Sequence, residues 1–218
     1  MLRLLDVTVS IAGVTVLRGV SPEIPPSRTV ALIGRNGAGK TTTLRAIMGF
    51  AMPSAGRILL DDQELGPLPP FERPRLGIGY APEDRRLFGS FTVEQNILLP
   101  AEVCRLGRME TRQRLERIYS MLPEVTAMRG RKAGSLSGGQ GKMVALGRAL
   151  MVGSRIVLLD EPFQGLAPAL AHRYADALRR LRENAPELAI LVTESNPKLL
   201  AGLADVTYTI ERGHIELG

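Results

Sequence analysis

A glycine-rich octapeptide between an apolar run and a helical pattern constrains the fold of this chain more than any other feature. Residues 34–41 read Gly-Arg-Asn-Gly-Ala-Gly-Lys-Thr and follow the apolar run Val30–Ile33. Glycines permit a tight turn whose main-chain N–H groups face one anion, and the N-terminus of the following helix adds its dipole. The order of strand, glycine loop and helix therefore predicts a phosphate-binding loop in an α/β fold.

The side chains of this loop suit the polyphosphate of ATP bound together with Mg²⁺. Lys40 is expected to reach the β and γ phosphates, and the Thr41 hydroxyl is expected to ligate the metal. An ordinary glycine-rich turn between a strand and a helix is the alternative interpretation. The residues predicted to bind the nucleotide in this loop are Gly34, Asn36, Gly37, Ala38, Gly39, Lys40, Thr41 and Thr42.

Two acidic residues follow a second apolar run, Ile156–Leu159. Asp160 ends this expected strand, where phosphate-loop proteins place the acid that holds the magnesium shell. Glu161 comes next and is expected to polarise a water for in-line attack on the γ-phosphate. The acidic start of an exposed loop is the alternative. We predict that Asp160 is a metal ligand and that Glu161 and Lys40 are catalytic.

A serine and two glycines stand before another helical pattern. Ser137 is a good N-cap, and the glycines let the helix N-terminus approach an anion closely. Taken alone, these residues are only a good cap. In the sequence these residues stand between the phosphate loop and the strand that ends in two acidic residues. In that position they indicate a second phosphate-binding surface, formed by Ser137, Gly138, Gly139 and Gln140.

The chain is organised as one α/β core that is split by a helical arm. Its 218 residues suffice for one large domain with an insertion. Strand patterns fill residues 1–33, helical patterns rich in Arg and Glu fill residues 93–122, and α/β alternation then returns. We expect a single P-loop NTPase domain, whose sheet is mostly parallel and carries antiparallel strands near the N-terminus. Its expected core subdomain comprises residues 1–83 and 154–218, and its helical subdomain comprises residues 84–153.

The amino-acid composition limits the classes of partner that this chain is expected to bind. Five phenylalanines, four tyrosines and no tryptophan are too few for a stacking surface on single-stranded nucleic acid, so no nucleic-acid partner is expected. The net charge of +6 suggests an anionic partner, although a solvated basic surface is the commoner cause. No apolar run approaches the roughly 20 residues of a membrane helix, so we expect any membrane role to require a partner.

Together these segments resemble the nucleotide-binding subunit of ATP-binding cassette (ABC) transporters over essentially the whole chain. GRNGAGKT resembles the Walker A motif, LSGGQ the family signature, RIVLLDEP the Walker B motif with its catalytic glutamate, and Gln164–Pro168 the D-loop. Within this family, GIGYAPEDRRLF, FTVEQN and EPFQGLAP are most similar to importer ATPases of the branched-chain amino acid and urea/amide group.

The resemblance implies an enzyme that hydrolyses Mg-ATP in a head-to-tail dimer, either of two copies or with a second ATPase subunit. Each ATP would lie between Walker A of one subunit and the signature of the other. Hydrolysis would drive transmembrane permease subunits at the cytoplasmic face of the membrane, with a solute-binding protein acting indirectly. Residues 83–106 would receive the permease, with Arg85, Arg86 and Phe88 as candidates; arginines that merely solubilise an exposed helix are an equal alternative.

Three positions depart from the family pattern. Ile11 replaces an aromatic residue that stacks on adenine, and Glu83 replaces the Q-loop glutamine, where we still expect it to meet the magnesium shell. Ser195 replaces the switch histidine and is too short to reach a γ-phosphate; either it or Asn196 is expected to cap the helix that begins at Pro197. These departures leave open a weakly active or inactive chain that pairs with a more active ATPase subunit.

Overall fold

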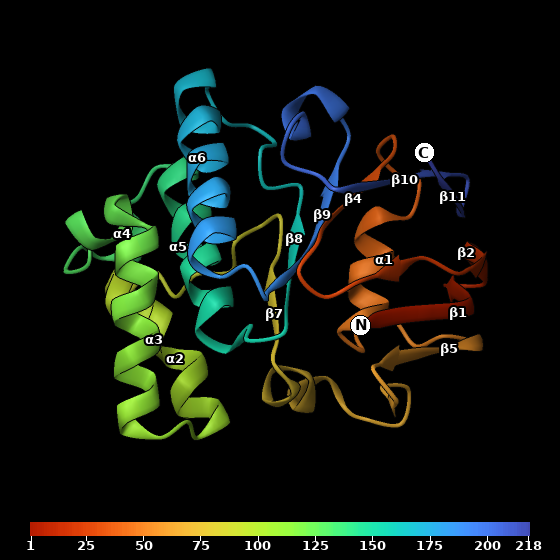
Figure 1. Cartoon of the computed structure of the whole chain (residues 1–218), viewed down its shortest axis with the longest axis horizontal. Coiled ribbons are helices and arrows are strands. Elements are labelled where there is room, and N and C mark those ends of the chain that lie inside the picture. The colour runs from red at the N-terminus through yellow and green to blue at the C-terminus, as the bar shows by residue number, and fades with distance from the viewer.

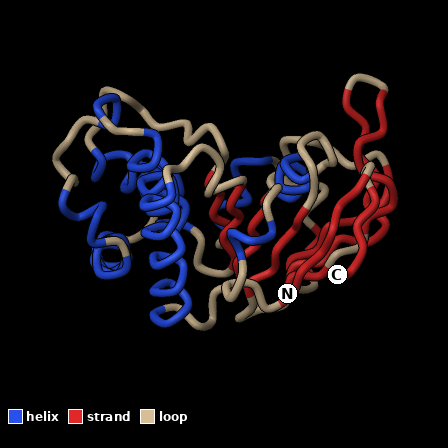
Figure 2. Tube along the Cα trace, turned by 90° about the horizontal axis from the view of Figure 1, so that it is seen from above, coloured by secondary structure: helices blue, strands red, loops and turns tan.

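The computed structural model describes all 218 residues, which form two sheets and a group of helices. Most helices gather at one end of the molecule, and the antiparallel strands lie at the other (Figures 1 and 2). The helices are α1 (Lys40–Ile47), α2 (Val93–Cys104), α3 (Arg108–Met121), α4 (Pro123–Ala127), α5 (Gly138–Val152) and α6 (Pro168–Asn184). Short 3₁₀ helices cover Pro70–Leu76, Ala133–Ser135 and Pro197–Leu200.

The larger sheet is the parallel core. Its order is β11-β10-β4-β9-β8-β7, in which only β11 runs antiparallel to its neighbour. The strands are β4 (Thr29–Ile33), β7 (Ile78–Ala81), β8 (Ile156–Asp160), β9 (Ala189–Glu194), β10 (Val206–Glu211) and β11 (His214–Leu217). Because β4, β8 and β9 run parallel, their carboxyl ends meet at one edge, where ligands bind in open α/β sheets.

The smaller sheet is antiparallel and has the order β2-β1-β5-β6, with β3 paired to β1. Its strands are β1 (Leu2–Ile11), β2 (Val14–Val20), β3 (Glu23–Ile24), β5 (Ala55–Leu60) and β6 (Gln63–Glu64). Helix α1 packs between the two sheets, because Leu44 and Ile47 share one buried cluster with Val9 of β1 and Leu32 of β4. The helix that follows the phosphate loop is therefore held on both sides.

Helices α5 and α6 belong to a second core on the other face of the parallel sheet. The apolar positions of α6 recur at helical spacing, so Tyr174, Leu178 and Leu181 point into this core together with Val157 of β8. Helix α5 lies so close to β7 that a Cβ on Gly79 would come within 2.2 Å of the Ala149 carbonyl oxygen. None of the helices combines the length and apolar character needed to span a bilayer.

The predicted fold class is confirmed: a mostly parallel sheet carries antiparallel strands from the N-terminal region, and helices lie between its strands in the sequence. We did not predict β5 or β7: the β5 segment does not alternate, and β7 is a run of only four residues, although it lies within the segment GIGYAPEDRRLF. The division into residues 1–83 with 154–218 and residues 84–153 stays a prediction. Helix α5, which falls in the predicted helical subdomain, shares one hydrophobic core with α6 and β8.

Candidate active site

The glycine loop joins the carboxyl end of β4 to the first residue of α1. Gly37 and Gly39 have φ values of 81° and 119°, a left-handed backbone that a side chain would oppose. Gly39 directly precedes the helix, so the free N–H groups of the first turn of α1 open onto the loop. The local backbone therefore has the form of an anion site.

A pocket of about 280 Å³ opens beside this loop and unites most of the predicted site. It is lined by Val16, Asn36, Gly37, Gly39, Lys40, Thr41, Thr42, Glu83, Glu161 and Gln164. Gly34 and Ala38 belong to the loop but do not line the pocket. The loop and the acidic element, which are far apart in sequence, thus meet in one place.

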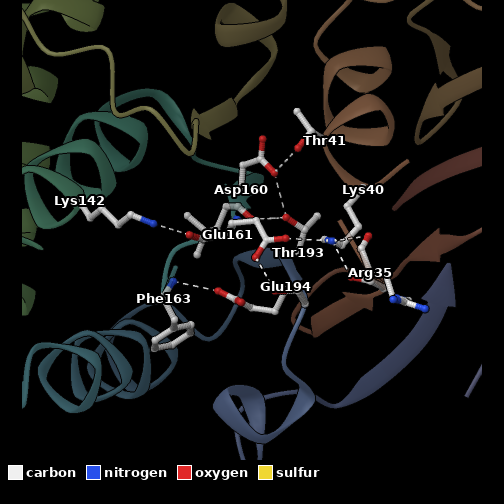
Figure 3. A network of polar contacts seen from close by, with 12 residues as sticks. Arg35, Lys40, Thr41, Lys142, Asp160, Glu161, Phe163, Thr193 and Glu194 are labelled. Atoms are coloured by element: carbon white, nitrogen blue, oxygen red, sulfur yellow. Dashed lines mark hydrogen bonds and ion pairs between the residues drawn. The ribbon is translucent and has the colours of Figure 1, made fainter. Parts of the chain in front are cut away.

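Lys40 is the cation of this pocket and is only 4% exposed. Its ammonium group donates to the main-chain carbonyls of Gly34 at 2.6 Å and Arg35 at 3.0 Å, and it lies 2.9 Å from Oε1 of Glu161 (Figure 3). A buried ammonium beside a row of main-chain N–H groups is suited to a phosphate. Phosphate oxygens would compete with Glu161 for this cation.

Asp160, at the end of β8, is held by three hydroxyl groups. Its Oδ1 accepts from Thr41 and from Thr193, both at 3.0 Å, and its Oδ2 accepts from the Tyr80 hydroxyl at 3.1 Å. Burial raises the pKa of Asp160, and these three hydrogen bonds oppose the rise. Thr193 lies directly opposite Asp160 in the β8–β9 pairing, so the sheet register fixes this contact.

The oxygen atoms around Asp160 fit a magnesium ion. Thr41 and Asp160 are in contact, and both line, together with Glu83, a neighbouring cavity of about 500 Å³. Magnesium prefers hydroxyl and carboxylate oxygens and is usually bound by one or two protein groups plus water and substrate phosphates. No cluster of three or more His, Cys, Asp or Glu residues is placed to hold a metal. A metal held here would therefore complete its shell with phosphate and water.

Glu161 is 3% exposed and has an unusual backbone. Its φ of 46° lies in the left-handed region, which is costly for a residue with a side chain. Its N–H lies 3.2 Å from the Thr193 carbonyl and 3.1 Å from the Thr193 hydroxyl. The Ser195 hydroxyl lies 3.4 Å from its Oε2. Contacts with β9 thus fix the residue that we predicted to be the base.

A second buried carboxyl group, that of Glu194, faces the same region and is 1% exposed. Its Oε1 accepts from the Phe163 N–H at 2.8 Å. Burial, reinforced by the neighbouring Glu161 carboxylate, raises the pKa of Glu194 to about 7, although the Phe163 hydrogen bond opposes this. One carboxyl group beside the predicted base therefore titrates near neutral pH.

The signature residues lie at the N-terminus of α5, and none of them lines the pocket. Ser137 caps the helix as expected: its hydroxyl accepts from the Gln140 N–H at 3.3 Å, and the Gln140 side chain accepts from the Ser137 N–H at 3.0 Å. Gly138 and Gly139 form the first turn. The chain thus carries two separate candidate anion sites.

The predicted permease surface lies next to the second cavity, of about 500 Å³, which adjoins the pocket. Arg86 lines this second cavity. Arg86 pairs with Asp84 at 2.8 Å, and Arg85 is partly buried. Phe88 is 51% exposed, and its ring centroid lies 5.3 Å from that of Phe91. This loop therefore presents an exposed aromatic pair, and its charged residues Asp84 and Arg86 line a cavity.

The structure shows where Ile11 lies and whether Ser195 or Asn196 caps the helix that begins at Pro197. Ile11 is 44% exposed at the end of β1 and does not line the pocket, whereas Val16 of β2 does. Asn196 caps the 3₁₀ helix, because its side chain accepts from the Lys198 N–H at 3.1 Å. The alternative in which Ser195 is the cap is therefore wrong.

Four residues that contact Asp160 or Glu161 had no role in the sequence analysis. Thr193 and Glu194 end the strand beside β8, and this position is the one signal that would have indicated them. Tyr80 and Lys142 carry no sequence signal, because each reaches the site from a different element of the fold.

Comparison with known proteins agrees with this geometry. The ABC transporter family model matches residues 17–164. The chain is 35% identical over 200 residues to the lipopolysaccharide export system ATP-binding protein LptB of Acidithiobacillus ferridurans, a match that covers 92% of this chain and 82% of that protein. It is 33% identical over 215 residues to the probable branched-chain amino acid transport ATP-binding protein LivF of Archaeoglobus fulgidus, covering 99% and 90% respectively.

A solved structure of the ATP-binding subunit of an ABC transporter has the same fold. Its TM-score is 0.86 at 26% identity, and the match covers 100% of this chain and 89% of that one. The family match spans the phosphate loop, the signature and the acid-tipped strand, the three elements described above. The chain therefore belongs to the ABC transporter family, as an ATP-binding subunit with an ABC ATPase domain.

Proposed function

We propose that this chain hydrolyses Mg-ATP to power an importer of a small polar solute, of the branched-chain amino acid, urea or amide type. One observation carries the catalytic part: a single pocket is lined by Lys40, Thr41 and Glu161, and Thr41 is bonded to Asp160 at 3.0 Å. One site thereby offers a cation for the phosphates, oxygen ligands for a metal and a carboxylate for the attacking water.

Each residue has a distinct role in this proposal. Lys40 and the main-chain N–H groups of the loop bind the β and γ phosphates of ATP. Thr41 and Asp160, with Glu83, hold Mg²⁺, which when bound neutralises the charge that develops on the transferred phosphoryl group. Glu161 accepts a proton from the attacking water at its carboxylate and orients that water for in-line attack.

The signature belongs to a second half-site. In a head-to-tail dimer, Ser137, Gly138, Gly139 and Gln140 would close over the ATP held by the other subunit. Two features support this arrangement: these residues stand outside the pocket of their own chain, and the N-terminus of α5 supplies the positive end of a helix dipole.

We further propose that transmembrane permease subunits hold this chain at the cytoplasmic face of the membrane. The exposed Phe88, together with the charged pair of Arg86 and Asp84 that lines a cavity of about 500 Å³, is suited to receive a segment of such a partner. A solute-binding protein would act through the permease only.

An export role is a second candidate function, because the identity to an ATP-binding protein of lipopolysaccharide export, 35%, is as high as the 33% to one of amino-acid transport. Purification of a tagged chain with its membrane partners separates the two. An importer should yield permease subunits together with a solute-binding protein. Permease subunits recovered without any solute-binding protein would favour export.

A weakly active partner in a heterodimer is the alternative for the catalytic role, and Ser195 at the switch position favours it. The test is Mg-ATP hydrolysis by the purified chain beside Glu161→Gln at equal protein concentrations. Turnover that rises faster than linearly with protein concentration, and that Glu161→Gln lowers to a small residual rate, supports a self-pairing catalytic dimer. Equal inactivity of both chains with retained ATP binding would overturn it in favour of the heterodimer.

A further inference from the structure

Lys142, a partly buried lysine of α5, reaches the predicted base from the opposite side to Lys40. Its ammonium group donates to the main-chain carbonyl of Glu161, as Figure 3 shows. Lys142 follows the last signature residue, Gln140, by two positions on the same helix. Helix α5, which carries the signature, is therefore bonded directly to Glu161 at the end of β8 in the same chain.

The peptide that Lys142 contacts is the one with a costly backbone. Glu161 has a φ of 46°, and such conformations persist where the surroundings fix them. Its N–H faces Thr193, as described above, and its carbonyl accepts from the Gln164 N–H at 3.2 Å and from Lys142. Lys142 is the only side chain that donates to this carbonyl. It therefore closes the set of contacts that hold the Glu161 backbone.

The charge of Lys142 suits this place. Burial lowers the pKa of Lys142, and the charges of Glu194, Glu83 and Glu161 oppose this shift and favour the charged ammonium. Its hydrogen bond goes to the carbonyl of Glu161, whereas Lys40 contacts the carboxylate of the same residue. Lys142 can thus fix the backbone of Glu161 without occupying the carboxylate oxygens that a water would need.

We propose that Lys142 is a positioning residue for ATP hydrolysis, which holds the main chain of Glu161 so that its carboxylate faces the phosphate-loop pocket. This inference rests on the proposed role of Glu161 as the base. Because a positioning residue acts through another group, its removal should lower the rate of the chemical step and leave the binding of ATP nearly unchanged.

The test compares Lys142→Met, Lys142→Arg and Lys132→Met as purified chains. Lys132 is the matched control, because it is an exposed lysine that donates to a main-chain carbonyl, that of Ser90, at 2.8 Å. We expect Lys142→Met to lower kcat about tenfold or more and to change KM for ATP less than about twofold. Lys142→Arg, which keeps a cation with donors, should recover most of kcat, and Lys132→Met should match the wild type.

A double-mutant cycle with Glu161→Gln separates positioning from a general loss of structure. If Lys142 acts through Glu161, adding Lys142→Met to Glu161→Gln should reduce the residual rate less than about twofold. A full further loss in that background, or a Lys142→Met chain with the kcat of the wild type, would overturn this inference alone. A wild-type chain without turnover would overturn the proposed catalytic function as well.

Discussion

The molecule has two candidate anion sites, and they differ in burial. One is the pocket beside the phosphate loop, and the other is the N-terminus of α5. In the pocket and directly beside it, Lys40, Glu161 and Asp160 are each at most 4% exposed and are held by partners from several elements. At α5, Ser137 and Gly138 are exposed, and the Ser137 hydroxyl is bonded only to the Gln140 N–H. The first region is organised for chemistry within the chain, and the second is organised to meet another surface.

A negative charge introduced at the signature tests whether the N-terminus of α5 meets the nucleotide of another subunit, and it should have the largest effect. Gly138 is exposed, and the nearest atom to an added Cβ is Nη1 of Arg85 at 3.7 Å, so Gly138→Asp fits without strain. An acidic residue in the first turn also favours a helix. We expect turnover to fall about a hundredfold, because the added carboxylate repels the nucleotide of the other subunit. ATP binding and the melting temperature should stay unchanged, and turnover within twofold of the wild type would break the comparison.

The buried carboxyl group of Glu194 tests how far the pocket is closed to water. Its folded pKa of about 7 lies above the ordinary value of 4.5, so between these pH values the folded state binds more protons than the unfolded state. The free energy of unfolding therefore falls as the pH rises through this window. Above it, the buried Glu194 carboxylate is ionised and its full destabilising effect is present.

Glu194→Gln should remove that cost, since the amide oxygen can still accept from the Phe163 N–H. We expect the variant to gain about 3 kcal/mol in unfolding free energy over the wild type at pH 8, and close to nothing at pH 4.5. Denaturant unfolding at both pH values measures the difference. A gap that does not change with pH would contradict the burial of this carboxylate.

Tyr80 tests whether contacts behind Asp160 tune the metal site. Tyr80→Phe deletes the hydroxyl that donates to Oδ2 of Asp160 and leaves the ring in place. Groups that orient a metal ligand typically affect metal affinity by tenfold or more, so the Mg²⁺ concentration for half-maximal turnover should rise about tenfold. Tyr119→Phe is the control, because Tyr119 donates to Glu94 in the helical arm. An equal effect of both variants would remove Tyr80 from the metal site.

Ile11, which lies outside the pocket, tests where the adenine base binds, and its substitution should have the smallest effect. Ile11→Tyr should provide a ring for the adenine base, since stacking on nucleic-acid bases is worth about 1–3 kcal/mol. We expect ATP affinity to rise about fivefold, measured by titration with a fluorescent ATP analogue. Ile11→Leu is the control and should bind as the wild type does. No gain for Ile11→Tyr would mean that the base lies elsewhere.

The sequence predicted what is local and missed what depends on packing. The phosphate loop, the cap at Ser137 and the strand that ends at Asp160 each lie within one short segment, so spacing and residue type suffice to predict them. The contact of Asp160 with Tyr80 joins residues 80 positions apart and depends on the order of the strands in the sheet.

The same reason accounts for Ser195 and Asn196. Sequence offered two caps for one helix start, and only the path of the chain after β9 decides between them. That path brings the Ser195 hydroxyl to Glu161 and leaves Asn196 to cap.

Mixing two inactive variants tests the head-to-tail pairing most directly. A dimer of one Glu161→Gln chain and one Gly138→Asp chain would contain one composite site with an intact Glu161 from one chain and an intact signature from the other. Random pairing makes half of the dimers mixed, so an equimolar mixture should recover about a quarter of the wild-type rate, while each variant alone stays inactive. A mixture as inactive as its components would contradict the account that the two regions complete one another across a dimer.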